Sequence, residues 1–229
     1  MSFSVVILSK NIQNLRVCVR EVRANEPDAR IIVVDDGLED RYIEDKRLIG
    51  PATIPVQYVE GVKPFVFSRN ANIGIRAAGD DDVILLNDDA ILKTPDGFSK
   101  LEAVSKAHTE YGVIAPVSDA VGNPNQMVRM ERAGLRDEPR MVCFICVYIP
   151  RSTINTVGLL DEEFVGYGFD DDSYCLRTRR AGLKIGVYDL CYIDHSTLKS
   201  TFRTRPEGAS LEQNAEIFKR KYGGGNWDL

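Results

Sequence analysis

The stretch Val83-Ile84-Leu85-Leu86-Asn87-Asp88-Asp89-Ala90 decides the fold class of this chain. Four consecutive apolar residues, two of them β-branched, are typical of a strand that is buried on both faces of a parallel sheet. The apolar run stops at Asn87-Asp88-Asp89, whose side-chain oxygens suit a hard cation such as Mg²⁺ or Mn²⁺. A diphosphate ligand could complete the shell of that cation. The alternative, a solvated acidic turn without a ligand, stays open at this point.

Comparable apolar runs alternate with helical patterns through the first half of the chain. A stripe at intervals of three and four residues predicts a helix over 12–22. A second helix is expected from a cap at Ser68 to Ala78, because Gly79 can end it. This alternation predicts an α/β domain with a mainly parallel, twisted sheet flanked by helices. The expected strands cover residues 4–8, 31–34, 56–59, 83–86 and 113–115.

The second half of the sequence changes character and predicts antiparallel strands. These strands are expected at 127–130 and 141–149, followed by a helix from Asp170 to Ala181 that Gly182 closes. Further strands are expected at 184–187 and 191–194, and a last helix near 211–222. No repeat and no linker divides the chain, so we expect one domain over residues 1–229.

Three more polar clusters follow predicted strands or open a helix. Asp35 and Asp36 precede Gly37, where they could accept hydrogen bonds from a nucleoside or merely close an Asp-Gly turn. The glycine-rich run 166–168 leads to three carboxylates at residues 170–172, which is more than helix capping needs. His195 follows an apolar run and could join Asp89 as a metal ligand if the fold brings them together.

Composition excludes several classes of protein. A net charge of −5 and a pI of about 5.2 argue against broad contact with nucleic acid. The five cysteines lie mostly in apolar runs and do not resemble a disulfide framework, which favours a reducing compartment. No signal or membrane-spanning pattern is found, so we expect a cytoplasmic location. The absence of Gly-x-Gly-x-x-Gly and Walker loops disfavours dehydrogenases and kinases.

Taken together, the motifs resemble those of glycosyltransferase family 2. The matching segments are the opening strand through Asn11, residues 33–37, Arg69-Asn70-Ala71-Asn72-Ile73-Gly74 leading to 85–90, and 166–182 followed by His195. The resemblance implies a GT-A fold, with a nucleotide-sugar-binding half over about 1–117 and an acceptor half over about 118–229. It implies metal-dependent, inverting transfer of a sugar from a UDP-, GDP- or dTDP-linked donor to a hydroxyl acceptor of unknown class.

The resemblance also implies roles for individual residues. Asp171 takes the place of the catalytic base, with Asp170 beside it, and Asp89 and His195 would bind Mn²⁺ or Mg²⁺. The donor would be bound by Ser9, Asn11, Asp35, Asp36, Arg69, Asn70, Gly74, Asn87 and Asp88. The acceptor would be bound by Tyr167, Gly168 and Asp172.

Two departures from the family pattern keep rival functions open. The first position of the usual Asp-x-Asp motif is Asn87, and an acidic position of relatives is Ser173. A nucleotide-sugar-binding module that has lost catalysis is therefore one alternative. A sugar-nucleotide pyrophosphorylase is another, although the chain lacks an early Gly-rich, Arg-containing phosphate loop.

Overall fold

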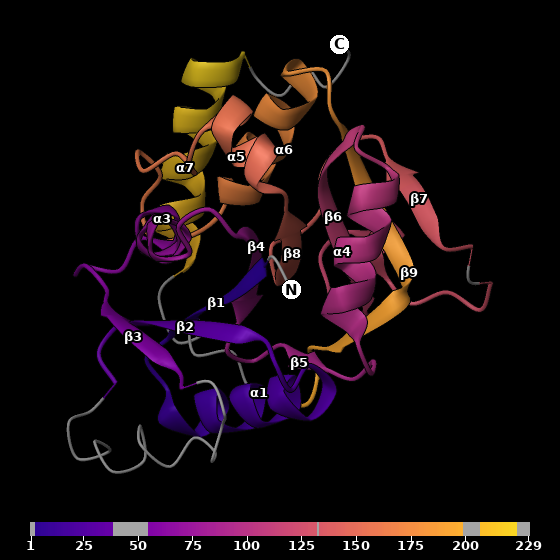
Figure 1. Cartoon of the computed structure of the whole chain (residues 1–229). Helices are drawn as coiled ribbons and strands as arrows, with labels where there is room; N and C mark the ends of the chain where they lie inside the picture. The colour runs from indigo at the N-terminus through magenta and orange to yellow at the C-terminus, as the bar shows by residue number, and fades with distance from the viewer. Residues whose placement is uncertain (1–2, 39–54, 132, 199–206, 224–229) are drawn as a thin grey trace.

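The computed structural model describes residues 3–38, 55–131, 133–198 and 207–223 (Figure 1). Within these ranges one sheet of nine strands has helices packed on both faces. The strands are β1 (Phe3–Ser9), β2 (Arg30–Asp35), β3 (Gln57–Glu60), β4 (Asp82–Asn87), β5 (Ile91–Leu92), β6 (Tyr111–Ser118), β7 (Leu135–Glu138), β8 (Cys146–Ile149) and β9 (Lys184–Asp194). The helices are α1 (Ile12–Asn25), α3 (Phe67–Ala77), α4 (Gly97–Ala107), α5 (Arg151–Val157), α6 (Asp170–Arg180) and α7 (Glu207–Tyr222), with a 3₁₀ turn, η2, at Pro124–Gln126.

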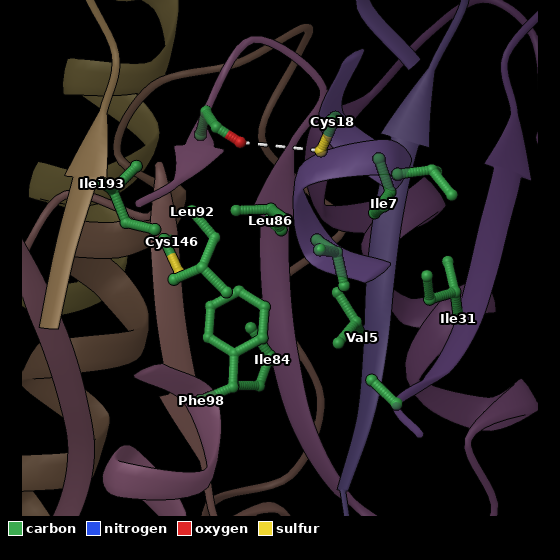
Figure 2. Packing of buried hydrophobic residues seen from close by; sticks show 14 of the residues in the cluster. Val5, Ile7, Cys18, Ile31, Ile84, Leu86, Leu92, Phe98, Cys146 and Ile193 are labelled. Atoms are coloured by element: carbon green, nitrogen blue, oxygen red, sulfur yellow. Dashed lines mark hydrogen bonds between the residues drawn. The ribbon is translucent and has the colours of Figure 1, made fainter. Parts of the chain in front are cut away.

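The first half of the sheet is parallel, in the order β3-β2-β1-β4. Every residue of β1 is buried because helices cover both faces of this strand. Val5 and Ile7 pack with α1 on one face, and Val6 packs with α3 on the other, as the two-residue period of a strand requires. Figure 2 shows the α1 side of this core, where the Cys18 thiol donates to the Ala90 carbonyl across 3.6 Å.

The second half of the sheet is mixed. Strand β8 lies antiparallel between β4 and β6, β6 pairs with β9 in parallel, and β5 and β7 add antiparallel pairs to β9. The α/β class with a large sheet flanked by helices is confirmed, and its all-parallel part is the N-terminal half. One sheet crosses both halves of the chain, so their division into nucleotide and acceptor parts stays a prediction.

The predicted strand over 127–130 is wrong. Residues Pro124–Gln126 form a 3₁₀ turn, and Met127 makes only an isolated bridge to Ser118. The side-chain amide of Gln126 accepts from the Cys143 N–H at 2.8 Å and donates to the Cys143 carbonyl at 3.2 Å. These bonds occupy the backbone of Cys143, so the predicted strand 141–149 is limited to β8.

Three further expectations need correction. The strands expected at 184–187 and 191–194 form one strand, β9, whose pairing with β6 shifts register where buried Asp189 bonds to Arg136. Ser68 does not cap α3, because Val66 is the cap position and the Ser68 hydroxyl donates to Asp170. The sequence also missed helix α4, whose first N–H groups bond to the buried carboxylate of the distant Glu26.

Helix α7 confirms the last predicted helix and stands beside α5 and α6 (Figure 1). On its apolar side, Ile217 and Phe218 pack in one cluster with Leu176 of α6 and with Phe164, which precedes that helix. No helix in the described ranges combines the length and apolar character that crossing a bilayer needs. The five cysteines are free thiols, and Cys143 precedes β8 instead of sharing a strand with Cys146.

Candidate active site

The carboxyl ends of six strands, β1, β2, β3, β4, β6 and β9, lie at one edge of the sheet. In the parallel first half, Ser9 at the end of β1 pairs with Asp35 of β2, and its neighbour Leu8 pairs with Asn87 of β4. Strands β6 and β9 run in the same direction, because β8 is antiparallel to both β4 and β6, and Ser118 pairs with Ile193 near their ends. Ligands bind at this edge in open α/β sheets. The fold therefore gathers the polar clusters at the ends of β2, β4 and β9 on one side.

Asp89 and His195 are brought together from positions more than a hundred residues apart in the chain. The Nε2 atom of His195 lies 3.3 Å from Oδ1 of Asp89, and both side chains are largely buried. The other ring nitrogen, Nδ1, bonds to the Ala120 carbonyl at 2.7 Å, which directs Nε2 toward the carboxylate. Burial alone would lower the pKa of His195, but its hydrogen bond to Asp89 and the charge of that carboxylate give a net rise.

Asp119, which the sequence did not single out, fixes the backbone around the histidine. Its carboxylate accepts from the His195 N–H at 2.8 Å and from the Ser196 hydroxyl at 2.6 Å. It follows β6 directly, so it belongs to the same class of polar residue after a buried strand as Asp35 and Asp89. Burial raises the pKa of Asp119, and these hydrogen bonds outweigh that rise, so the net shift is downward.

The pair Asp89 and His195 fits one divalent cation. Bonds of about 2.1 Å at right angles place two ligand atoms about 3 Å apart, close to the separation observed here. A backbone carbonyl on the second ring nitrogen is also the usual arrangement of a metal-binding histidine. No cluster of three or more His, Cys, Asp and Glu ligands occurs within the ranges that the structure covers. Oxygens of a substrate or of water suit the remaining positions around such a cation.

Asn87 and Asp88 shape the turn that presents Asp89. The turn closes through a bond of 3.1 Å from the Ala90 N–H to the Asn87 carbonyl. The Asp88 side chain is 1% exposed and accepts a bond of 2.6 Å from the Ser9 hydroxyl. The buried hydrogen bond between Ser9 and Asp88 thus links the ends of β1 and β4, while the Asp89 carboxylate faces His195.

The expected nucleoside-binding residues divide into two kinds. Asp35 closes the Asp-Gly turn, because its Oδ1 accepts from the N–H groups of Gly37 and Leu38. Asp36 instead accepts from the amide of buried Asn70 at 3.2 Å, and Asn70 accepts from the Val62 N–H at 2.8 Å. The Asp35 carboxylate thus closes the turn, Asp36 and Asn70 link the end of β2 to α3, and nucleoside contacts of these residues stay predictions.

Two residues expected to contact the donor also have structural roles. Asn11 caps α1 through bonds from the N–H groups of Gln13 and Asn14. Gly74 is buried where α3 crosses the sheet, and any Cβ there would overlap the side chain of Val6. The small size of Gly74 allows helix and sheet to touch, and its contact with the donor stays a prediction. Arg69 of α3 is half-buried.

A sharp loop delivers the three carboxylates of α6. Gly166, Gly168 and Phe169 have φ angles of 64°, 103° and 66°, so the chain is left-handed just before the helix. Phe169 pays a conformational cost that a glycine would not, because left-handed backbone disfavours a Cβ. Such strain at a ligand-facing loop persists only where surrounding contacts impose it.

Asp170 holds this loop from within. Its carboxylate is 3% exposed, one oxygen accepts from the Ser68 hydroxyl, and the other accepts from the Gly168 N–H at 2.8 Å. Burial raises its pKa to about 7 against the opposing effect of these bonds. Both oxygens accept hydrogen bonds from the protein, so this residue holds the loop, and a direct catalytic role for it stays a prediction.

Asp171 and Asp172 are both half-buried, unlike Asp170. Burial raises its pKa to about 7, with further contributions from the charges of Asp172 and Asp170. One of its oxygens accepts from the Asp172 N–H at 3.0 Å. Burial also raises the pKa of Asp172, although the guanidinium of Arg140 opposes that rise. A carboxylate titrating near neutrality is suited to accept a proton from a substrate.

Comparison with known proteins identifies the family to which this arrangement belongs. The sequence model described as "Glycosyl transferase family 2" matches residues 4–181, which include every strand of the sheet except β9. The chain belongs to glycosyl transferase family 2. A curated relative in Sinorhizobium fredii (strain NBRC 101917 / NGR234), "Uncharacterized protein y4gI", is 26% identical over 205 residues, covering 78% of this chain and 23% of the relative.

Solved structures confirm that this family 2 chain has the GT-A fold. GalNAc-T7 with UDP, GalNAc and Mn²⁺ superposes with a TM-score of 0.73 at 14% identity, over 85% of this chain and 44% of that one. The mannosyltransferase PcManGT from Pyrobaculum calidifontis, in complex with GDP-Man and Mn²⁺, superposes with a TM-score of 0.67 at 15% identity, over 88% and 58%. The chain thus spans about a quarter to three fifths of the length of these proteins.

Proposed function

We propose that this chain transfers a sugar from a nucleoside-diphosphate donor to an acceptor hydroxyl. The observation that carries the proposal is the meeting of Asp89 with His195 at the carboxyl edge of a family 2 sheet. Two structures with the same fold hold UDP or GDP-Man together with Mn²⁺. That chemistry suits the cation-compatible pair described above, and it makes UDP and GDP the first nucleotides to test.

Different residues of the chain would have different roles in the reaction. Asp89 and His195 would hold Mn²⁺ or Mg²⁺, which supplies positive charge to a diphosphate leaving group. The Asp171 carboxylate would accept the proton of the acceptor hydroxyl as that oxygen attacks the anomeric carbon. Direct attack by the acceptor inverts the anomeric centre and needs no covalent intermediate. Asp170 keeps the loop in place through Ser68 and the Gly168 N–H.

A binding experiment tests the metal part of this proposal. UDP, GDP and dTDP are titrated into the protein by calorimetry with Mn²⁺, with Mg²⁺ and with excess EDTA. Asp89→Asn and His195→Gln should remove most of the metal-dependent affinity of the nucleotide that binds. Asp80→Asn is the matched control, because Asp80 is an exposed carboxylate before the start of β4, at the opposite end of that strand. Equal affinity with and without EDTA would contradict a metal-assisted donor site.

A turnover experiment tests the enzymatic part. For each nucleotide that binds, the corresponding nucleotide sugars are incubated with the protein, with water or simple sugars as acceptors. The release of free nucleoside diphosphate is measured. Metal-dependent release by the wild type, lost in Asp171→Asn, is expected. Tight binding without any release would support the alternative of a nucleotide-sugar-binding module that has lost catalysis.

A further inference from the structure

We propose that Asn214 of helix α7 is a positioning residue for the acidic loop, so that α7 is part of the catalytic unit. The inference rests on the proposed function of Asp171, but it concerns a residue outside the segment 4–181 that the family model matches. Asn214 is 0% exposed, and no sequence motif pointed to it.

The side chain of Asn214 holds the loop backbone at four points. Its Oδ1 accepts from the Val165 N–H at 2.8 Å. Its Nδ2 donates to the carbonyls of Val165, Tyr167 and Gly168 at 2.9, 3.2 and 3.0 Å. The NH₂ group has two hydrogens for these three carbonyls, so one hydrogen is shared between two of them. Serving both an N–H and carbonyls takes a side chain with an acceptor and an NH₂ group.

These bonds account for a backbone conformation that the loop would not adopt alone. Gly166, Gly168 and Phe169 are left-handed, and the carbonyl of Gly166 is held separately by the Phe67 N–H at 2.7 Å. These hydrogen bonds are part-buried, and a carbonyl that loses its partner in such a place costs free energy, so the loop keeps this shape where donors face it. Asn214 supplies these donors for the residues on both sides of Gly166.

Helix α7 is anchored independently of this amide. Phe218 belongs to one apolar cluster with Leu176 of α6, and the Tyr222 hydroxyl donates to Asp161 at 2.9 Å. Lys221 forms ion pairs with Asp161 and Glu163. Since these contacts fix the helix, the Asn214 amide can act as a rigid reference for the loop that begins α6. Loss of the amide should therefore release the loop while leaving the helix docked.

The test compares Asn214→Ala and Asn214→Ser with the control Ile217→Ala. Ile217 lies on the buried side of the same helix but packs with apolar residues, so its truncation weakens docking without touching the loop carbonyls. Hydrogen–deuterium exchange of peptides covering 164–170 is measured on the whole protein. Asn214→Ala should exchange there about tenfold faster, as expected for a locally opened segment. Asn214→Ser, which keeps one hydroxyl, should lie between Ala and wild type.

Kinetics then separate positioning from general stability. With the nucleotide sugar that the wild type turns over, Asn214→Ala should lower kcat by about tenfold or more, since a misplaced catalytic group costs up to on the order of 100-fold per ångström. Its nucleotide Kd and donor KM should stay within about twofold, as uniform binding is not lost. Ile217→Ala should lower the melting temperature and keep kcat.

Several results would overturn the inference. Unchanged loop exchange in Asn214→Ala would mean that the amide does not hold the loop. Faster exchange with an unchanged kcat would mean that the loop position is irrelevant to chemistry. Asn214→Ala could fail to fold, and the wild type then provides the test. If its Val165 amide exchanges rapidly compared with amides inside α6, Asn214 does not hold the loop. A wild type that turns over no nucleotide sugar defeats the proposed function, and the exchange measurements still decide whether Asn214 holds the loop.

Discussion

Replacing the carboxylate of Asp171 by an amide is the most direct perturbation of the proposed chemistry. Asp171→Asn keeps the size of the side chain and an acceptor for the Asp172 N–H, but it cannot take up a proton at neutral pH. General-base assistance is typically worth about 10² to 10⁴ in rate, so kcat should fall by about that factor. Nucleotide affinity should hardly change, because the contacts at Asp89 and His195 are untouched.

The pH dependence of kcat gives a second, independent test of Asp171 as the base. With a pKa of about 7 for Asp171, about a tenth of the base is ionised at pH 6 and about nine tenths at pH 8. The ionised form accepts the proton, so kcat should rise about tenfold between pH 6 and pH 8 in the wild type. In Asp171→Asn, kcat should no longer rise between pH 6 and pH 8. Initial rates of nucleoside diphosphate release over this pH range, at saturating donor and metal, provide the measurement.

Asp172→Asn is the matched control for this reasoning. The charge of Asp172 raises the pKa of Asp171, so its removal should shift the rise of kcat to lower pH. Because Asp172 is also expected to bind the acceptor, kcat at neutral pH should fall, but by less than in Asp171→Asn. A dead Asp170→Asn beside a normal Asp171→Asn would place the base at Asp170. Near-normal rates in all three variants would refute the catalytic role of this cluster and leave helix capping as its function.

Three more substitutions test the donor site and the scaffold. Asp36→Ala should raise the donor KM more than it lowers kcat, and steady-state kinetics with the opposite pattern would show that Asp36 acts on the chemical step. Gly74→Ala should destabilise the fold by about 1–3 kcal/mol through overlap with Val6, measured by urea unfolding, and an unchanged midpoint would contradict the tight helix–sheet contact. Glu26→Ala should lower the free energy of unfolding by about 2–4 kcal/mol in the same assay, because the N–H groups of Phe98 and Ser99 lose their buried acceptor. A decrease below about 0.5 kcal/mol would mean that solvent replaces the carboxylate.

The parallel half of the fold could be predicted because its signals are local. Strands β1, β2 and β4 are buried on both faces, so each is a continuous apolar run in the sequence. Helix α6 likewise carries its own start and stop, with acidic residues in its first turn and Gly182 after its end. The family motifs lie in these same segments, which is why fold class and family could be predicted from the sequence.

The errors occurred where a distant partner decides the local structure. Residues 127–130 look like a strand, yet the Gln126 side chain takes the backbone groups of Cys143 that a strand would pair. Helix α4 has no side-chain cap of its own at Asp96, and its first turn depends on Glu26, more than seventy residues earlier. Propensity within a short window contains no information about such contacts.

Local patterns and family motifs were enough to predict the α/β class, the polar residues after buried strands, and Asp89, Asp171 and His195 as candidates for chemistry. The differences between these candidates arise only in the folded protein. It buries Asp170 with both oxygens engaged while Asp171 stays half-buried, and it sets His195 against Asp89 through the Ala120 carbonyl. Identical carboxylates acquire different roles because burial and hydrogen-bond partners are properties of the folded surroundings.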